Sequence, residues 1–411
     1  MDEQRKSESE LVPALRFEGF TDPWEQRKLG EYLCVSAETN KAYEFSREDV
    51  LSVSGEYGVV NQVEFQGRSF AGANVSGYGI LRTGDLVYTK SPLKTNPYGI
   101  IKANLGRSGI VSTLYATYKT KNEANPRFID VYFSLNPRVN RYLYPLVNKG
   151  AKNDMKVSAE NAIRGYVVFP SLTEQAEIGA LFAKIDSLIA LHQRKYEKLK
   201  TVKQSLLEKM FPKEGEDVPE LRFEGFTDPW EQRKLGEIAH RVTRKNEEGA
   251  SDLPLTISAQ HGLVDQRDFF GSQVASRDMR GYYLLEKGEF AYNKSTSGDS
   301  PWGAVKRLAR YEKGCLSTLY ICFGLDVGDP SFLVTYYETN RWHKGIRLIA
   351  AEGARNHGLL NIAPRDFFET ELTLPGEIEE QSRIGALFAR LDSLIALHQR
   401  ELEILKNLKK A

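Results

Sequence analysis

The side chains best suited to bind a ligand are basic, amide and hydroxyl groups that gather in two stretches of this 411-residue sequence. From Leu86 to Asn122 the chain has six Lys or Arg residues and no Asp or Glu. Lys and Arg bind phosphates or guanine, and Asn pairs with adenine, so these stretches are candidate nucleic-acid contacts. The candidates are Lys90, Ser91, Lys94, Asn96, Lys102, Arg107, Lys152 and Asn153, then Lys294, Ser295, Thr296, Ser297, Lys306, Arg307, Arg355 and Asn356. The alternative for any single residue is a solvated surface loop, and the net charge of +1 gives no independent support.

One of these stretches contains a motif that could indicate catalysis. Thr95–Gly99 reads TNPYG and is similar to the DPPY or NPPY loop of amino-methyltransferases that act on adenine, but it lacks the second proline. Its counterpart, Asp299–Gly303, reads DSPWG and has no amide at that position, and no FxGxG cofactor loop lies upstream. We therefore interpret the motif as a turn.

Other catalytic and metal-binding patterns are missing from the sequence. There is no GxxxxGK[ST], GxSxG or HExxH motif, and Cys34, Cys315 and Cys322 form no CxxC pair. The sequence predicts neither catalysis nor a metal site in this chain. The odd number of cysteines, the charged N-terminus and the lack of a stretch of about 18 apolar residues predict a cytoplasmic protein that does not contact a membrane.

An internal repeat organises the chain. Residues 15–31 read LRFEGFTDPWEQRKLGE and recur without change at 221–237, and the block EQAEIGALFAKIDSLIALHQR at 174–194 recurs with few changes at 380–400. We call these four segments the constant frame. The modules between them differ at most positions, as expected for two similar domains that read different targets; the alternative is a recent duplication without functional meaning.

The second repeated block predicts a pair of long helices. Apolar residues follow a heptad pattern typical of coiled coils, and the second helix must run antiparallel if it packs on the first. The predicted seam is Ile178, Leu181, Ile185, Leu188, His192, Leu199 and Val202, with Ile384, Leu387, Leu391, Leu394, His398 and Leu405. For His192 and His398 we favour a role in fixing register over a metal or proton role. At about 1.5 Å per residue the helices would extend roughly 55 Å and 45 Å, comparable to one turn of DNA at about 34 Å.

The expected fold class is α/β: two similar α/β domains separated by a pair of long antiparallel coiled-coil helices, with a pseudo-twofold internal repeat. Strands are expected in 84–91, 110–118, 288–295 and 315–323, within a mixed sheet, and helices near 137–147 and 331–342. The predicted boundaries are 1–31 (N-terminal tail and first repeated lead-in segment), 32–171 (first module), 172–212 (central helix), 213–237 (second lead-in segment), 238–377 (second module) and 378–411 (C-terminal helix).

These motifs together resemble the specificity (S) subunit of type I restriction–modification enzymes, over nearly the whole chain. The resemblance implies that each module is a target recognition domain for one half of a split double-stranded DNA site, and that the helices set the unread spacer. It implies two modification (methyltransferase) subunits and restriction (endonuclease/translocase) subunits as partners. S-adenosylmethionine, ATP and Mg would be bound by those partners, and this subunit would have no cofactor.

The resemblance also implies that the partners dock on the constant frame. The candidate docking residues are Trp24, Trp230, Phe182 and Phe388, although each Trp could instead be a structural clasp on the helix base. Two rival functions remain, a fused DNA adenine methyltransferase and a coiled-coil scaffold that binds proteins.

Overall fold

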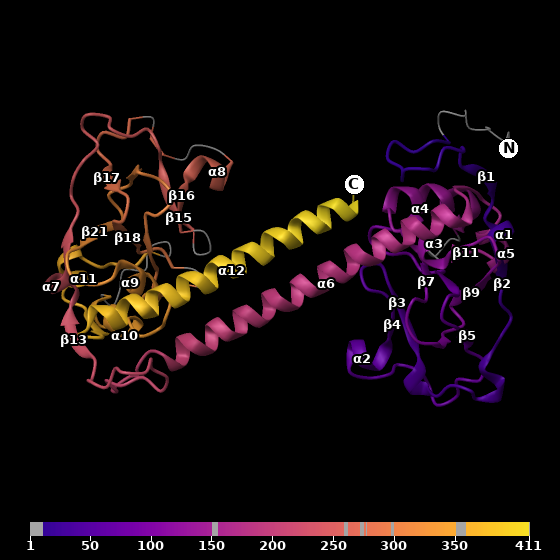
Figure 1. Ribbon diagram of the computed structural model, residues 1–411, viewed down its shortest axis with the longest axis horizontal. Coiled ribbons are helices and arrows are strands. Elements are labelled where there is room, and N and C mark those ends of the chain that lie inside the picture. Colours follow the sequence, from indigo (N-terminus) through magenta and orange to yellow (C-terminus); the bar gives the residue numbers. More distant parts are fainter. Residues whose placement is uncertain are drawn as a thin grey trace. The chain divides into compact units, whose positions relative to one another are not determined.

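The computed structural model describes residues 11–149, 155–258, 262–271, 275–276, 278–296, 300–350 and 359–410. The chain forms two compact units, Met1–Leu191 with Glu403–Ala411, and His192–Leu402. Each unit contains a small sheet-based module and parts of two long helices (Figure 1).

The first module is built from short strands and helices that precede the helix α6. Its elements are β1 (Glu25–Lys28), α1 (Leu29–Tyr32), β2 (Leu33–Val35), η2 (Asn40–Ala42), η3 (Arg47–Asp49), β3 (Leu51–Ser54), β4 (Gly58–Asn61), α2 (Gln62–Gln66), β5 (Gly79–Leu81), β6 (Leu86–Thr89), β7 (Ile101–Ala103), β8 (Gly109–Val111), β9 (Tyr115–Thr120), α3 (Pro126–Tyr132), α4 (Asn136–Leu143), η4 (Tyr144–Leu146), β10 (Asn148–Lys149), β11 (Met155–Lys156), α5 (Ala159–Ala162), β12 (Tyr166–Phe169) and α6 (Leu172–Lys209).

The second module repeats this order. Its elements are β13 (Glu231–Lys234), α7 (Leu235–Ile238), β14 (Ala239–Arg241), β15 (Leu255–Ser258), β16 (Gly262–Asp265), α8 (Gln266–Phe270), β17 (Tyr283–Glu286), β18 (Phe290–Asn293), β19 (Ala304–Arg307), β20 (Lys313–Leu316), β21 (Ile321–Leu325), α9 (Pro330–Tyr336), α10 (His343–Ile349), α11 (Pro364–Phe368), β22 (Glu371–Leu374) and α12 (Ile378–Lys410).

The central sheet has the same topology in both modules. It has four strands, in the order β2-β9-β6-β7 in the first module and β14-β21-β18-β19 in the second. The strands of both sheets pair antiparallel, so the mixed sheet expected from the sequence is wrong. Direct loops join β6 to β7 and β18 to β19, and such connections reverse the strand direction, whereas parallel neighbours would need a longer crossover.

Two expected strands are each divided by a turn. The stretch 110–118 separates into β8 and β9, and the Tyr115 N–H donates to the Ser112 carbonyl (3.0 Å). The stretch 315–323 separates in the same way, with Tyr320 donating to Ser317 (3.2 Å). An STLY sequence forms both turns, and the serine hydroxyl stabilises each by accepting from the leucine N–H two residues on.

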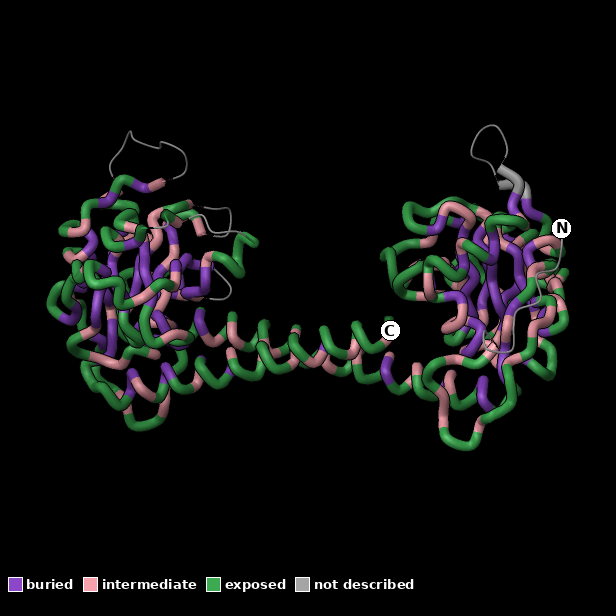
Figure 2. Tube along the Cα trace, turned by 90° about the horizontal axis from the view of Figure 1, so that it is seen from above, coloured by how far each residue is buried: buried purple, intermediate pink, exposed green. Residues whose placement is uncertain are grey.

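Buried residues gather in the sheets and the short helices packed on them (Figure 2). The first core contains Tyr88, Tyr118, Phe128 and Phe169, and its counterpart in the second module contains Tyr292 stacked on Phe367. Aromatic side chains bury large areas per residue, which suits modules of this size. Cys315 and Cys322 are buried thiols, and burial raises the pKa of Cys322 to about 12.

The two long helices pair antiparallel within the second unit, as the sequence predicts. Lys203 of α6 contacts Asp392 of α12 (2.5 Å), and His192 contacts His398 (3.1 Å). Residue numbers therefore rise along α6 as they fall along α12. Among the described residues no helix is long and apolar enough to span a membrane.

The repeat also relates the ion pairs of the helices. Lys409 and Asp186 form an ion pair (2.5 Å) within the first unit. Each of them lies 206 positions from one partner of the pair between Lys203 and Asp392 in the second unit. The same interaction thus occurs twice with the two helices exchanged.

Candidate nucleic-acid interface

The loops that follow β6 and β18 end with the same contacts in their described parts. The Tyr88 hydroxyl donates to the Tyr98 carbonyl (2.7 Å), and in the second module the Tyr292 hydroxyl donates to the Trp302 carbonyl (2.8 Å). Each loop ends at a glycine with positive φ, at +85° and +83°. The TNPYG motif is therefore a structural turn, as expected, and the two loops are closed in the same way but have different side chains.

In the first loop the predicted contact residues are partly accessible. Ser91 and Lys94 are exposed and Lys90 is half-buried. Asn96 is only 3% exposed, and its backbone exchanges two hydrogen bonds with Leu93. Its side-chain oxygen accepts from the Thr95 hydroxyl (2.9 Å). The prediction that Asn96 reads bases is wrong for this structure, because its side chain is buried.

Carboxylates from other segments neutralise basic residues of the stretch 86–122, which has no Asp or Glu of its own. Lys102 is 9% exposed at its side chain and lies 3.7 Å from Asp130. Arg107 pairs with Glu64 (3.2 Å). The predicted DNA contact is therefore wrong for Lys102, which is buried against its counter-charge, and Arg107 is not a free cation.

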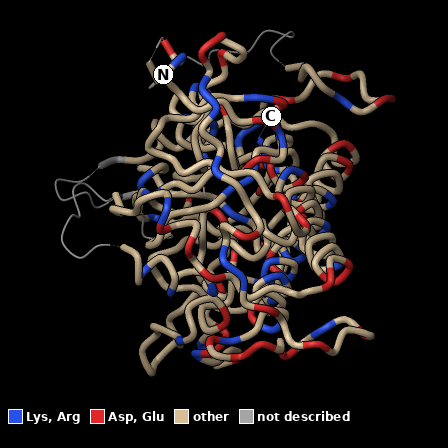
Figure 3. The backbone as a smooth tube through the Cα atoms, turned by 90° about the vertical axis from the view of Figure 1, so that its left-hand side faces the viewer, with Lys and Arg blue, Asp and Glu red and all other residues tan. Residues whose placement is uncertain are grey.

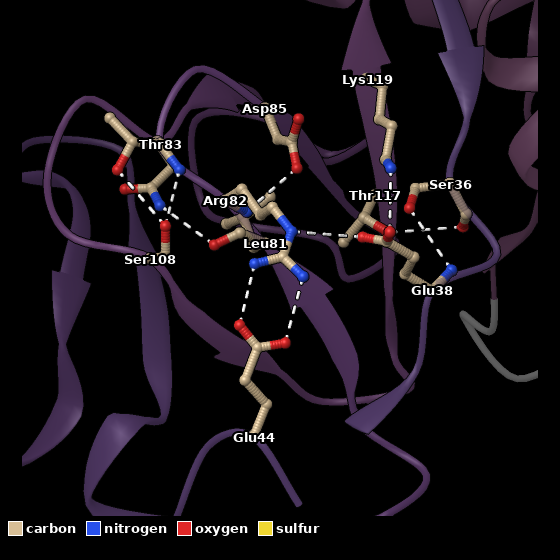
Figure 4. Close-up of polar contacts among 11 residues, drawn as sticks. Ser36, Glu38, Glu44, Leu81, Arg82, Thr83, Asp85, Ser108, Thr117 and Lys119 are labelled. Atoms are coloured by element: carbon tan, nitrogen blue, oxygen red, sulfur yellow. Dashed lines mark hydrogen bonds and ion pairs between the residues drawn. The ribbon is translucent and has the colours of Figure 1, made fainter. Parts of the chain in front are cut away.

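Glu38 and Glu44 neutralise a further part of this surface (Figure 4). The Arg82 guanidinium donates two hydrogen bonds to Glu44 (2.9 and 3.1 Å), and Lys119 contacts Glu38 (3.0 Å). The hydrogen bond from Lys119 lowers the pKa of Glu38, so this carboxylate stays charged. Burial raises the pKa of Asp85, although its carboxylate accepts from the Arg82 N–H.

The local positive charge predicted from the sequence is consequently smaller in the folded module. In Figure 3, where the second module faces the viewer, Lys and Arg are likewise interspersed with Asp and Glu. Of the predicted cationic contacts in the described part of the first module, Lys90 and Lys94 form no ion pair with a described carboxylate, whereas Lys102 and Arg107 do.

In the second loop Ser295 is exposed, whereas Lys294 and Thr296 are half-buried. Burial lowers the pKa of Lys294, because desolvation penalises its charged form. The Lys294 carbonyl accepts from the Leu360 N–H (3.0 Å), which ties the loop to the segment that begins at 359. The predicted contacts Lys152, Asn153, Ser297, Arg355 and Asn356 lie outside the described residues.

Lys306 and Arg307 lie on β19, at the edge of the second sheet, and are half-buried. Neither forms an ion pair with a described carboxylate. A groove of 560 Å³ is lined by Lys306 together with Lys200, Arg341 and Glu208, and by Lys203, which pairs with Glu338 (2.6 Å). The second module thus presents a partly basic groove beside its predicted contacts.

Sequence reasoning missed a buried ion pair that holds each lead-in segment on its helix. Arg16 donates two hydrogen bonds to Glu174 (2.8 Å each), and Arg222 does the same to Glu380 (2.7 and 2.8 Å). Both glutamates are 1% exposed. The sequence did contain an indication of this pair, because the arginine and the glutamate are identical in both copies of the constant frame.

Two glutamines of the frame complete this attachment. Gln381 accepts from the Asp329 N–H (2.9 Å) and donates to the Pro375 carbonyl (2.8 Å). Gln175 accepts from Asn125 (2.9 Å) and donates to Pro170 (3.0 Å). The repeated Glu-Gln pair therefore fixes the start of each long helix against its module.

The predicted docking residues divide into two classes. Trp230 is 4% exposed and Phe388 is 1% exposed, and both pack around Phe211, so the docking prediction is wrong for these two. Trp24 is half-buried and donates to Glu174 (3.3 Å), which favours the clasp alternative. Phe182 is half-buried on α6 and stays a docking candidate.

The apolar stripe of the helices serves two surfaces rather than one seam. Ile178, Ile384, Leu387, Leu391 and Leu199 pack against the module cores. Four predicted seam residues are partly exposed: Leu181 (43%), Leu188 (43%), Val202 (38%) and Leu394 (37%). Their place in the seam stays a prediction. Ile185 is buried and Leu405 is half-buried.

Comparison with solved structures gives relatives in fold. The type I restriction–modification system S subunit from M. genitalium matches with a TM-score of 0.56 at 12% identity, over 97% of this chain and 96% of that chain. The HsdS subunit from Thermoanaerobacter tengcongensis matches with a TM-score of 0.43 at 16% identity, over 94% of each chain. A chain from a study of complex assembly and conformational transition of the type I R-M system matches at 0.44 and 15%, over 97% of each chain.

The sequence itself matches no protein-family model and no curated protein. The likeness to the M. genitalium subunit concerns the fold and includes both modules and both long helices.

Proposed function

We propose that this chain, which has the fold of a type I restriction–modification S subunit, is the DNA sequence-specificity subunit of such a complex. Each module reads one half of a bipartite, asymmetric site in double-stranded DNA. The helices α6 and α12 set the length of the unread spacer and dock the modification subunits. The chain performs no catalysis of its own.

The observation that carries this proposal is the loop that occurs once in each module. Two glycine-terminated loops with the same tyrosine–carbonyl hydrogen bond carry Lys90, Ser91 and Lys94 in one copy and Lys294, Ser295 and Thr296 in the other. Loops closed in the same way but with different side chains suit two readers of two sequences, because base edges are distinguished by the side chains that reach them.

The proposal includes the partners and the compartment. Two modification subunits would bind S-adenosylmethionine and methylate adenine, and restriction subunits would use ATP and Mg and cut DNA. The complex would act in the cytoplasm, in defence against foreign DNA. The exposed apolar residues of the helices, such as Leu181 and Leu394, are available for such partners.

A selection experiment tests the proposed function. The chain is mixed with a candidate modification subunit, and random DNA duplexes that it retains are sequenced. We expect a bipartite consensus with a gap of fixed length. A pool without consensus would favour the protein-binding scaffold, and S-adenosylmethionine binding by the isolated chain in calorimetry would favour the fused methyltransferase.

Lys306→Ala should weaken DNA binding by the assembled complex. Lys306 lies in the basic groove without a carboxylate partner among the described residues, so we assign it a phosphate contact. Loss of one phosphate contact should reduce the slope of the logarithm of the binding constant against the logarithm of the salt concentration by about 1. It should weaken binding to specific and non-specific duplexes alike. Fluorescence anisotropy at several salt concentrations measures both quantities.

The matched control for this substitution is Lys287→Ala. Lys287 is already paired with Glu312 (2.6 Å) on the surface of the same module, so its loss should leave the slope unchanged. Equal slopes for both variants would show that Lys306 does not contact a DNA phosphate.

A further inference from the structure

Three side chains with metal-binding atoms converge where α6 and α12 pair in the second unit. His192 Nδ1 lies 2.7 Å from Glu401 Oε2, His398 Nδ1 lies 3.1 Å from the same oxygen, and the two Nδ1 atoms are 3.1 Å apart. Their side chains are 16%, 13% and 37% exposed in the order His192, His398, Glu401. All three belong to the same compact unit.

The antiparallel pairing explains why these groups meet. The histidines occupy equivalent positions of the repeat and face each other across the two helices. Glu401 follows His398 by three residues, and side chains three apart lie on the same face of a helix. The pairing of Lys203 with Asp392 fixes the register that brings the helices together here.

The chemistry of this cluster suits a cation. An Nδ1–H can donate to Glu401, but in the tautomer whose Nδ1 lacks a proton both rings and the carboxylate direct lone pairs toward a common point, where a cation can replace the hydrogen bonds. His and carboxylate are ligands that zinc prefers, at about 2.0–2.2 Å. Tetrahedral ligands at that distance are separated by roughly 3.3 Å, so the present 2.7–3.1 Å requires movements of only a few tenths of an ångström.

We propose that His192, His398 and Glu401 form a binding site for a divalent transition-metal cation, with zinc as the reference ion, that links α6 to α12. A set of two histidines and one glutamate leaves the fourth tetrahedral position to water. Binding joins two segments that are far apart in the sequence, so the metal stabilises the pairing of the helices and fixes their register. The proposal adds metal binding to the role in fixing register that the sequence favoured for the two histidines, and it does not depend on the proposed DNA role.

The repeat provides a way to strengthen the site. The exchange of helices that converts the Lys203 and Asp392 pair into the Lys409 and Asp186 pair converts Glu401 into Lys195. Lys195→Glu should therefore place a second carboxylate beside the histidines and supply the fourth ligand.

Zinc binding to the full-length chain tests the proposal. The chain is freed of metal with EDTA and titrated with zinc chloride in a calorimeter. We expect one high-affinity zinc per chain, and affinity lower by more than about tenfold in both His192→Gln and His398→Gln. In Lys195→Glu the affinity should rise. Cobalt(II) should give the intense visible absorption of a tetrahedral complex in the wild-type chain and lose it in the histidine variants.

His240→Gln is the matched control. His240 contacts the carboxylate of Asp326 (2.6 Å) but has no second histidine beside it in the described structure, so its loss should leave zinc affinity unchanged. Circular dichroism verifies that each variant keeps its helices. The proposal is overturned if the wild-type chain binds no zinc, or if the His192 and His398 variants bind it as the His240 variant does.

Discussion

In the Gly303→Ala variant the second module should no longer recognise its half of the DNA site. The bases recognised by the first module should stay unchanged. A Cβ atom at Gly303 would lie 2.2 Å from the Asn293 carbonyl oxygen and 2.8 Å from the Tyr292 ring. The nearer atom belongs to the backbone of β18 and cannot rotate away, so the loop itself must move. Because that loop carries Lys294 and Ser295, the side chains offered to DNA move with it.

Gly288→Ala separates the effect of the clash from the effect of the backbone angle. Gly288 has φ +98° and Gly303 has φ +83°, but a Cβ atom at Gly288 meets nothing within 4 Å. Both variants should therefore lose about 1–3 kcal/mol from the strain of a positive φ. Only Gly303→Ala should also lose its half-site in the duplex selection.

Two measurements distinguish these outcomes. Urea denaturation followed by circular dichroism gives the loss of stability, and the duplex selection gives the bases retained. Gly99→Ala and Gly84→Ala form the corresponding pair in the first module, since a Cβ at Gly99 would lie 2.0 Å from the Thr89 carbonyl and one at Gly84 no closer than 3.9 Å to Pro126. If Gly303→Ala and Gly288→Ala select the same sequences, the loop conformation does not determine recognition.

The repeat and the long helices could be predicted because their signals are local or periodic. The central helix predicted at 172–212 is observed as α6 (Leu172–Lys209), and the antiparallel pairing follows from its second copy. The hydrophobic strands were also recognisable. Their division at the STLY turns was not, because Leu114 and Leu319 look like core residues in sequence but are 65% and 59% exposed at the turns.

The charge pattern was the least predictable part of the candidate interface. The stretch 86–122 contains no acidic residue, but folding brings Asp130, Glu64 and Glu38 against its cations. These partners come from a helix or a loop outside the stretch, so their proximity depends on tertiary packing that a local charge count does not include. The burial of Asn96 depends in the same way on a turn conformation rather than on residue type.

The Glu380→Gln variant should lose about 3 kcal/mol of stability in the second unit, as expected when one partner of a buried ion pair is neutralised. Glu380 is 1% exposed and accepts two hydrogen bonds from Arg222, which is 12% exposed at its side chain. Arginine keeps its charge in proteins, so the Arg222 guanidinium stays charged after the substitution and must be buried without its counter-ion. The N-terminal turn of α12 would then separate from the second lead-in segment.

The neighbour Glu379 supplies the control, because it is exposed on the same turn of α12 and Glu379→Gln should change stability by less than about 0.5 kcal/mol. Thermal and urea denaturation compare the two variants.

The double variant Arg222→Met with Glu380→Met should recover part of the loss of stability, since apolar residues of similar volume leave no unpaired buried charge. If Glu380→Gln unfolds like Glu379→Gln, the ion pair does not hold the lead-in segment. A loss of stability confined to Glu380→Gln would show that the ion pair holds the lead-in segment. It would also explain why this arginine and glutamate are identical in both copies of the repeat, whereas the module surfaces differ.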